Sequence, residues 1–295
     1  MTPAAWSDIC AGIAGVAGAP FEAISRRAIG GGCINECYQL CGRGRDYFVK
    51  VNGPERRAMF EAEASALAEI AATGTVRVPA PVCWGANSDA SWLVLEHIEL
   101  AHAGPGSMEQ LGRNLAALHR VAQSEFGWIA DNTIGATPQI NTRCRDWIGF
   151  WRERRLGFQL ALAAKKRAPS SLLAKGEHLA HDFAPLLAGC TLKPVLLHGD
   201  LWSGNAGFDA RGTPVVFDPA AYYGHHEADL AMTELFGGFS AEFYAAYRAA
   251  LPLDPGYRVR KDLYNLYHVL NHYNLFGGGY ARQAEAMIDR LLAEI

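Results

Sequence analysis

The chain has 295 residues, of which half are hydrophobic and 19% are charged, so it can bury a sizeable core and is not disordered as a whole. Its formal net charge of −3 gives no basic surface for nucleic acid or for an anionic membrane, and no apolar run reaches the roughly 18 residues of a transmembrane helix. The length allows one large domain or two lobes, because folding units typically comprise roughly 100–200 residues.

The first 20 residues are rich in Ala and Gly, but they carry Asp8 and lack a basic start before an apolar core, which argues against a signal peptide. The seven cysteines are odd in number and contain no CxxC pair, so reduced thiols are expected. Cys33, Cys37 and Cys41 fall four residues apart, but in an extended chain neighbours lie about 13 Å apart, too far for shared metal ligation without a loop. We therefore expect a cytoplasmic protein with no nucleic-acid or membrane partner.

Short β-like runs separated by turns come next in the chain. They cover residues 23–29, 36–41, 47–51, 82–85 and 92–95. One helix interrupts them over about residues 55–72, with Pro54 as its first-turn proline. Its apolar stripe consists of Met59, Ala62, Ala66, Leu67 and Ile70. These patterns predict a small antiparallel β-sheet with one main helix.

A glycine-rich segment, residues 30–35, lies between two of these runs. Its glycines allow backbone N–H groups to approach a polyphosphate, so Gly31, Gly32 and Cys33 are candidates to bind a nucleotide. Three glycines at a hairpin tip more often form only a turn. No Walker A lysine follows them, so a P-loop fold is disfavoured.

Lys50 alternates with apolar neighbours inside the run at residues 47–51. It can point into a cleft toward nucleotide phosphates, as the strand lysine of a kinase does, although a solvated strand lysine is the simpler alternative. The following helix offers Glu61 and Glu63 as partners, and only one can face the cleft because residues two apart on a helix point to different sides. Glu63 is favoured because it is in register with the apolar stripe.

After residue 98 the sequence changes to long helical patterns. They cover about residues 108–120, 146–166, 173–187, 227–235, 241–250, 259–275 and 281–295. We therefore predict an α+β chain with a nucleotide-binding lobe at residues 1–97 and a larger, mainly helical lobe for catalysis and acceptor binding at residues 98–295. Glu96, His97 and Ile98 lie where the lobes join, so their backbone groups are candidates to hydrogen-bond adenine.

The most informative stretch is residues 196–205, followed by the apolar run that ends at Asp218. The stretch contains Asp200 and, five residues later, Asn205, and the following run adds the second acid, Asp218. These three residues make up the catalytic set of kinase-type phosphoryl transfer. Asp200 would accept the proton of the acceptor hydroxyl, while Asn205 and Asp218 would hold Mg²⁺. A His-Gly-Asp turn alone has a structural explanation, but the joint spacing favours a hydroxyl kinase that uses ATP and Mg²⁺.

Further polar and aromatic residues accompany this stretch. Trp202 follows Asp200 by two residues, where its indole could stack on a sugar or could pack in the core. The pairs His225, His226 and His268, His272 invite a metal interpretation, but no Glu follows His268 in an HExxH pattern, so core or surface positions are favoured. Asp229 is expected to be a buried structural acid that anchors the catalytic loop.

With these residues in place, the chain resembles the fructosamine kinase / ketosamine 3-kinase family, a branch of the aminoglycoside-phosphotransferase-like, protein-kinase-like fold. The resemblance spans nearly the whole chain and rests on residues 31–35, 47–50, 60–64, 126–128, 131–135, 198–205, 217–220, 227–232 and 274–280. The sequence departs from the commonest bacterial pattern at residues 224–227, Gly-His-His-Glu, where Gly-Asp-Arg-Glu is usual. This departure concerns the acceptor side rather than the ATP chemistry.

The resemblance implies a bilobal protein-kinase-like fold and ATP-dependent phosphorylation of the 3-hydroxyl of ketosamines, in deglycation repair. The acceptor would be a small fructosamine or ribulosamine adduct or a glycated lysine side chain. Two alternatives stay open: a choline- or aminoglycoside-kinase-like enzyme of the same fold, and a non-catalytic nucleotide-binding pseudokinase. The loss of Lys50, Asp200, Asn205 or Asp218 would favour the pseudokinase, and all four are present.

Cys33 directly follows three glycines in the loop expected to lie over phosphates. Backbone N–H groups and Lys50 would lower the pKa of its thiol there and favour the thiolate. We therefore expect a monomer, or a redox-dependent dimer that oxidation forms through Cys33 and that a reductant reverses. The alternative is an inert packing residue.

Overall fold

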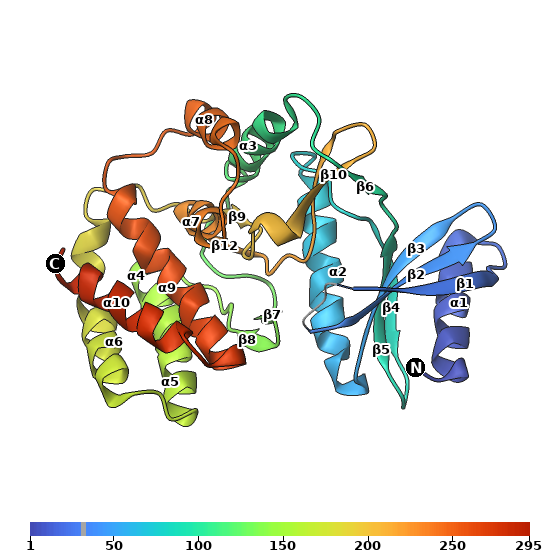
Figure 1. Cartoon of the computed structure of the whole chain (residues 1–295), viewed down its shortest axis with the longest axis horizontal. Coiled ribbons are helices and arrows are strands. Elements are labelled where there is room, and N and C mark those ends of the chain that lie inside the picture. Colours follow the sequence, from blue (N-terminus) through green and yellow to red (C-terminus); the bar gives the residue numbers. More distant parts are fainter. Residues whose placement is uncertain (31–33) are drawn as a thin grey trace. The chain divides into compact units, whose positions relative to one another are not determined.

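The computed structural model of the chain describes residues 1–30 and 34–295. It divides into two compact units, Met1–Ser107 with Ala206–Pro219, and Met108–Asn205 with Ala220–Ile295 (Figure 1). The first unit holds an antiparallel sheet and the second is mainly helical, which confirms the predicted α+β class. The assignment of nucleotide binding to residues 1–97 and of catalysis to residues 98–295 stays a prediction. In the described ranges, every helix is too short or too polar to cross a membrane.

A five-stranded antiparallel sheet forms the centre of the first unit. Its strands are β1 (Ala23–Ile29), β2 (Glu36–Gly42), β3 (Asp46–Asn52), β4 (Pro81–Ala86) and β5 (Ser91–Glu96), in the order β1-β2-β3-β5-β4. Each of the five predicted strands is present, with its ends within about one residue of those expected from residue type and alternation. In the register of the sheet, Lys50 of β3 lies opposite Cys37 of β2 and Leu93 of β5.

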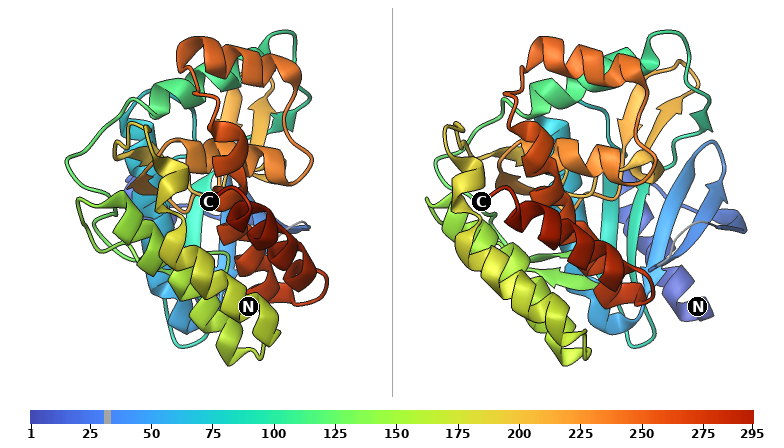
Figure 2. Two further views of the ribbon diagram at one scale, coloured as in Figure 1. Left: turned by 90° about the vertical axis from the view of Figure 1, so that its left-hand side faces the viewer. Right: turned by 60° about the vertical axis from the view of Figure 1, so that its left-hand side comes forward.

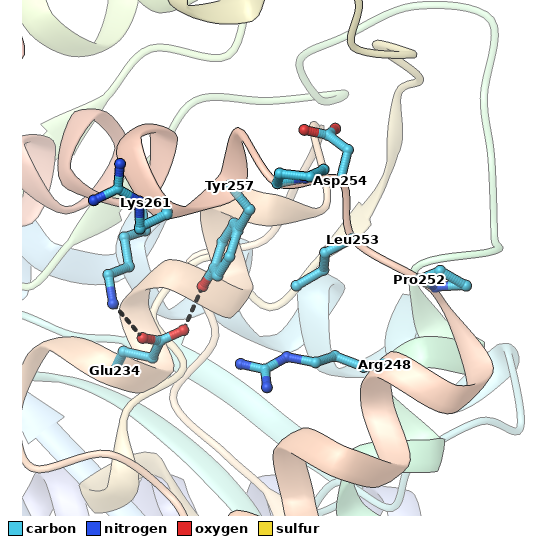
Figure 3. A pocket seen from close by; sticks show the side chains of 9 residues that line it. Glu234, Arg248, Pro252, Leu253, Asp254, Tyr257 and Lys261 are labelled. Atoms are coloured by element: carbon cyan, nitrogen blue, oxygen red, sulfur yellow. Dashed lines mark hydrogen bonds and ion pairs between the residues drawn. The ribbon is translucent and has the colours of Figure 1, made fainter. Parts of the chain in front are cut away.

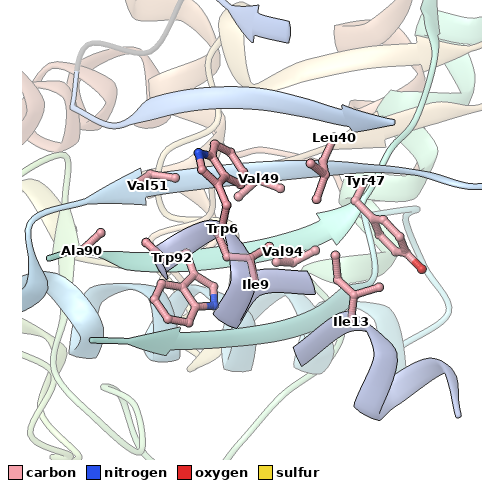
Figure 4. Close-up of a cluster of buried hydrophobic side chains, with 11 residues drawn as sticks. Trp6, Ile9, Ile13, Leu40, Tyr47, Val49, Val51, Ala90, Trp92 and Val94 are labelled. Carbon is pink, nitrogen blue, oxygen red and sulfur yellow. The ribbon is translucent and has the colours of Figure 1, made fainter. Parts of the chain in front are cut away.

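The two faces of the sheet are covered by different helices. Helix α1 (Pro3–Ala17) buries Trp6, Ile9 and Ile13 on one face (Figure 4). They pack against alternate strand residues, namely Leu40, Tyr47, Val49, Val51, Trp92 and Val94. Because side chains alternate along a strand, Lys50 points to the opposite face, which α2 (Arg57–Ala72) covers (Figure 1).

Helix α1 was not predicted from the sequence. Its start carries an ordinary helix signal, because Thr2 accepts a hydrogen bond from the backbone N–H of Ala5 at 3.3 Å and Pro3 occupies the first turn. Helix α2 was predicted to begin near residue 55, and the structure resolves that start into a 3₁₀ turn, Pro54–Arg56, followed by the helix proper.

A second, three-stranded sheet completes the first unit. It consists of β6 (Leu100–Ala101), β10 (Ala206–Asp209) and β11 (Pro214–Val216), in the order β11-β10-β6. The backbone N–H of Val216 donates to the carbonyl of Arg77 at 3.0 Å, so β11 is held to the segment that follows α2. Two residues after the end of this strand comes Asp218.

The second unit is mainly helical. Its helices are α3 (Ser107–Leu118), α4 (Trp147–Trp151), a π-helix (Arg152–Gly157), α5 (Phe158–Lys165), α6 (Ser170–Asp182), a 3₁₀ helix (Ala184–Leu187), α7 (Glu227–Leu235), α8 (Ala241–Ala250), α9 (Tyr257–Phe276) and α10 (Tyr280–Leu292). Helix α9 is buried over most of its length because α5, α7 and α10 all pack against it, and α10 also contacts α6 (Figure 2).

Two small antiparallel ribbons accompany these helices. Strand β7 (Asn132–Ile134) pairs with β8 (Thr137–Gln139), and β9 (Val195–Leu197) pairs with β12 (Tyr222–Gly224). All three residues of β9 are buried. The strand therefore delivers the chain from the core directly into residues 198–205, which contain Asp200.

Candidate active site

Lys50 lies at the centre of a buried ion-pair cluster in the first unit. Its Nζ donates to Glu63 Oε1 at 2.5 Å and to Asp218 Oδ1 at 2.6 Å, and the residue is only 3% exposed. Burial disfavours the charged amine, but the two carboxylates outweigh burial and raise the pKa of Lys50 above its ordinary value. The predicted pairing of Lys50 with Glu63, rather than with Glu61, is confirmed.

The environment of Glu63 differs from that of Lys50. Burial raises its pKa, and the negative charge of Asp218 adds to this, while Lys50 opposes the shift. Lys50 is therefore the cation that allows two carboxylates to lie in one small region. Without it, at least one of them would favour the protonated form.

Asp218 adopts an uncommon backbone conformation. Its φ of 59° lies in the left-handed region, which costs a non-glycine residue about 1–3 kcal/mol. Aspartate tolerates this region better than most residues, and the ion pair with Lys50 helps to hold it there. The Asp218 side chain is 47% exposed, so its carboxylate is bonded to Lys50 on one side and faces outward on the other.

Asp200 and Asn205 lie together in the second unit, on the turn that follows β9. The Nδ2 group of Asn205 donates to the backbone carbonyl of Asp200 at 2.9 Å and approaches Asp200 Oδ2 at 3.4 Å. A 3₁₀ turn, Ser203–Asn205, brings the amide back toward the acid. Because Nδ2 is bonded within the loop, the amide oxygen of Asn205 is the atom oriented away from that bond.

Gly199 is needed at its position for two reasons. Its φ is 84°, and a Cβ there would lie 2.1 Å from the carbonyl oxygen of Ala220. The backbone N–H of Ala220 also donates to the carbonyl of His198 at 2.9 Å. Residues 198–199 are thus packed directly against the chain that continues into β12.

Asp229, near the start of α7, anchors the same loop. Its carboxylate accepts from the backbone N–H of His198 at 2.6 Å and from that of Gly199 at 2.7 Å. Burial works against its charge, but hydrogen bonds from His119 and from Gly199 outweigh burial, and the pKa of Asp229 is lowered. The expected role of Asp229 as a buried acid that holds the catalytic loop is confirmed.

Trp202 lies on the surface rather than in the core. It is 37% exposed, and its ring meets Phe236 edge-on at a centroid distance of 6.1 Å. The ring centroids of Phe236 and His272 lie 4.7 Å apart, and the His272 ring also contacts the rings of Phe276 and Tyr280. This aromatic row was not predicted, because its members are far apart in the chain: Trp202 lies in the loop after β9, Phe236 directly follows α7, and the others lie on α9 and α10.

Glu96, His97 and Ile98 were predicted to bind adenine through their backbone groups. Glu96 ends β5, where its backbone N–H donates to the carbonyl of Ala80 at 2.8 Å and its carboxylate accepts from Arg77 at 2.8 Å. The half-buried His97 and Ile98 follow it outside regular structure.

Three predicted residues, Gly31, Gly32 and Cys33, lie outside the described residues. The cysteines of the described ranges are free thiols, namely Cys10, Cys37, Cys41, Cys83, Cys144 and Cys190. Redox control through Cys33 therefore stays a prediction.

His225, His226 and Glu227 bring potential metal ligands within 4.8 Å of one another. Their ligand atoms are already hydrogen-bonded: Arg260 donates to both oxygens of Glu227 at 2.7 Å, and the two histidine Nδ1 atoms lie 2.8 and 3.0 Å from tyrosine hydroxyls. Burial lowers the pKa of both histidines, that of His226 to about 3. The cluster is accounted for as a neutral histidine pair beside a buried ion pair.

A cavity of about 440 Å³ opens elsewhere in the second unit, between the end of α7, α8 and the start of α9 (Figure 3). The Glu234 carboxylate on its wall accepts from the Tyr257 hydroxyl at 2.6 Å and from Lys261 at 2.7 Å. Of its charged lining residues, Glu234 and Lys261 therefore pair with each other, and Asp254 pairs with Arg260. No predicted site residue of the described ranges lines it, so it is not the candidate active site.

Comparison with known proteins identifies the family. The family model for fructosamine kinase matches residues 5–294. The chain belongs to the fructosamine kinase family. As a member of this kinase family it is a phosphotransferase that uses ATP.

Relatives of this fructosamine kinase family member cover almost its full length. A Synechocystis protein named "Probable ketoamine kinase" is 48% identical over 99% of this chain and 98% of its own. A rice protein named "Protein-ribulosamine 3-kinase, chloroplastic" is 46% identical over 90% of this chain and 78% of its own.

Solved structures agree with the fold. One from Haemophilus somnus, named "Putative fructosamine-3-kinase", has a TM-score of 0.89 at 29% identity and covers 97% of each chain. The aminoglycoside phosphotransferase APH(4)-Ia has a TM-score of 0.67 at 14% identity, over 99% of each chain. This second likeness confirms the phosphotransferase fold and says nothing of the acceptor.

Proposed function

We propose that this protein transfers the γ-phosphoryl group of ATP to the 3-hydroxyl of a ketosamine, borne by a small molecule or by a lysine side chain. The observation that carries the proposal is the Asp200–Asn205 turn, in a chain that matches the fructosamine kinase family model from residue 5 to residue 294. A relative named for ribulosamine 3-kinase activity, at 46% identity, supports this acceptor class. The reaction fits a cytoplasmic enzyme of deglycation repair.

Asp200 is the catalytic acid–base group. In kinase-type phosphoryl transfer there is little covalent chemistry for the protein to do. The rate therefore depends on holding the acceptor hydroxyl in line with the γ-phosphorus and on accepting its proton. Asp200 receives that proton as the oxygen–phosphorus bond forms, and the phosphoryl group leaves ADP behind. The bond from Asn205 to the Asp200 backbone fixes the geometry of the turn.

Lys50 neutralises charge on the phosphates of ATP, and Glu63 holds it in place. A lysine with a raised pKa remains a cation throughout the physiological pH range. Because Lys50 is buried, its ammonium group is held in one position and its charge is screened little by solvent.

The donor set fits a magnesium ion. Asp218 and Asn205 provide carboxylate and amide oxygens, the hard ligands that Mg²⁺ accepts, and the outward side of the Asp218 carboxylate is exposed. When bound, the ion neutralises charge that develops on the phosphate oxygens. Asp218 and Asn205 would hold it, and the backbone conformation of Asp218 fixes the direction of its carboxylate.

Other residues bind the adenine, the phosphates and the acceptor sugar. Backbone groups of Glu96, His97 and Ile98 bind adenine, and Gly31, Gly32 and Cys33 contribute to the phosphate loop. Trp202 stacks on the sugar of the acceptor, because an exposed indole two residues from Asp200 offers an apolar face to a carbohydrate ring.

A coupled assay of ADP release tests the function. Purified enzyme with Mg-ATP is given fructoselysine and ribuloselysine side by side, with choline and an aminoglycoside as competing acceptor classes and Asp200→Asn as the inactive control. Release of ADP with a ketosamine only, and phosphate on its 3-hydroxyl by NMR, is the expected result. Turnover of choline or of the aminoglycoside alone would replace the acceptor assignment, and turnover of none with intact ATP binding would favour a pseudokinase.

A further inference from the structure

A buried chain of polar side chains extends from the anchor of the catalytic loop into the second unit. The Nε2 atom of His119 lies 3.2 Å from Asp229 Oδ2, and its Nδ1 atom lies 2.8 Å from the hydroxyl of Tyr247. The same hydroxyl lies 3.0 Å from Nδ1 of His226. His119 directly follows α3, Tyr247 lies on α8, and Asp229 lies on α7.

The hydrogen bonds of this chain have a consistent direction. Asp229 already accepts two backbone N–H groups, and as a carboxylate it can only accept, so Nε2 of His119 carries the hydrogen that points at it. In the tautomer that carries its hydrogen at Nε2, His119 accepts at Nδ1 from the Tyr247 hydroxyl. The Tyr247 oxygen in turn accepts from Nδ1–H of His226, which is neutral because burial lowers its pKa to about 3.

The location of the chain makes each of these bonds costly to lose. His119 is 3% exposed, Asp229 is 1% exposed and Tyr247 is fully buried. A buried carboxylate is tolerated only when charge-assisted hydrogen bonds replace its hydration. His119 supplies such a bond to Asp229, and Tyr247 fixes the orientation of its imidazole.

We propose that His119 and Tyr247 are positioning residues of the phosphoryl transfer, which act by holding the Asp229 carboxylate against the backbone N–H groups of His198 and Gly199. These two groups immediately precede Asp200, so a rotation of the Asp229 carboxylate displaces the acid–base residue itself. A displacement of about 1 Å is enough to cost about a hundredfold in rate. The assignment rests on the proposed kinase function, because it concerns the geometry of that reaction.

The alternative is a structural role, in which the chain only fills the interior between α3, α7 and α8. Both roles lower the melting temperature when a bond is removed. They differ in what happens to the loop at a temperature well below the melting point. If the residues position the loop, their removal changes kcat and the hydrogen exchange of the loop amides. If they only fill the interior, their removal changes neither.

Four variants separate these roles. Tyr247→Phe removes only the hydroxyl, His119→Leu removes both ring nitrogens, and His119→Gln keeps an N–H donor for Asp229. The matched control is Tyr244→Phe on the same helix, whose hydroxyl bonds to Thr233 and to the backbone N–H of Phe239 instead. For each, kcat and KM are measured by ADP release with fructoselysine, and hydrogen exchange of residues 195–205 is followed by mass spectrometry.

We expect kcat of His119→Leu to fall about tenfold to a hundredfold with KM for ATP within about twofold, and that of Tyr247→Phe to fall about threefold to tenfold. His119→Gln recovers most of the loss, Tyr244→Phe stays within about twofold of wild type, and exchange in residues 195–205 speeds up in the two damaging variants only. If His119→Leu does not fold, Tyr247→Phe decides, because it creates almost no cavity. Wild-type kcat and wild-type exchange in folded Tyr247→Phe would overturn the proposal.

Failure of the kinase assignment gives a different pattern. The wild type would then release no ADP with any ketosamine, while the exchange of residues 195–205 would still respond to His119→Leu and Tyr247→Phe if the anchor is as proposed.

Discussion

Nζ of Lys50 lies 2.6 Å from Oδ1 of Asp218, although 168 positions separate the two residues in the chain. The contact joins β3 of the main sheet to a residue two positions after the last strand of the three-stranded sheet in the same unit. With Glu63 on its other side, the lysine faces two carboxylates, so the cluster carries a net negative charge. A cluster with one surplus carboxylate suits a site that takes up a cation.

The first prediction concerns Lys50. Replacement by Met should lower kcat at least about a hundredfold and destabilise the protein by about 3–5 kcal/mol, because Glu63 is left buried beside Asp218 without a cation. Lys50→Met with Glu63→Gln should regain much of the stability and none of the activity. Urea denaturation and ADP release measure the two effects, with Lys175→Met, a partly exposed lysine, as the control. Activity in the double variant would show that the charge of Lys50 is not needed.

The second prediction tests the acid–base residue. Asp200→Asn should fold and bind ATP normally but lose turnover by at least about a hundredfold, the scale of a positioned proton acceptor. Calorimetric titration with ATP and single-turnover kinetics separate binding from chemistry. Asp182→Asn, at an exposed aspartate of α6, is the matched control. Near-normal turnover in well-folded Asp200→Asn would remove Asp200 from this role.

The third prediction concerns the metal. Asp218→Ala should weaken binding of Mg-ATP while leaving binding of metal-free ATP closer to that of wild type, because the carboxylate is proposed to act through the ion. Titration calorimetry with Mg²⁺ and with EDTA gives the two affinities. Unchanged affinity for Mg-ATP together with an unchanged rate would require another ligand in place of Asp218.

Much of the fold was predictable because its signals are local. The five strands of the main sheet alternate in hydrophobicity, and α7 and α8 begin and end at the predicted residues. The paired segments β7 with β8 and β9 with β12 escaped prediction, because strands of three residues carry too few alternations. The π-helix at Arg152–Gly157 was predicted only as part of one long helix, since its sequence pattern is helical.

Residues of the candidate site were likewise predictable only where their signal is local. Glu63 was found through helical register, and Asp229 through its place in a helix after the catalytic stretch. His119 and Tyr247 were missed, because a buried histidine and a buried tyrosine have no spacing that reveals their common partner. Whether Trp202 is buried also depends on packing against Phe236, a residue 34 positions later, and the sequence left this open.

The fourth prediction concerns acceptor binding by Trp202. Trp202→Ala should raise KM for a ketosamine about tenfold or more and leave KM for ATP within about twofold, because burying apolar surface against a large side chain is worth about 1.5–3 kcal/mol. Trp84→Ala is the matched control, since Trp84 is a similarly exposed tryptophan on β4. Equal changes in KM for the acceptor in both variants would remove the stacking role.

The last prediction concerns stability and pH. Burial lowers the pKa of His226 and of His268 to about 3, and it shifts the pKa values of His225 and His272 in the same direction. An unfolded histidine titrates near about 6.5, so between these values the unfolded chain binds more protons than the folded chain. Stability from these histidines is therefore present above about pH 6.5 and is lost as the pH falls below it.

For His226 and His268 alone, the free energy of unfolding should fall by about 2 kcal/mol between pH 6.5 and 5.5. Urea denaturation at several pH values measures this slope. His268→Leu should reduce it by about half of that amount, and it breaks no hydrogen bond at Nδ1, which has no partner among the described residues. If His268→Leu shows the full wild-type slope, the acid sensitivity comes from other groups, because a buried neutral imidazole must contribute to it whenever unfolding exposes it to water.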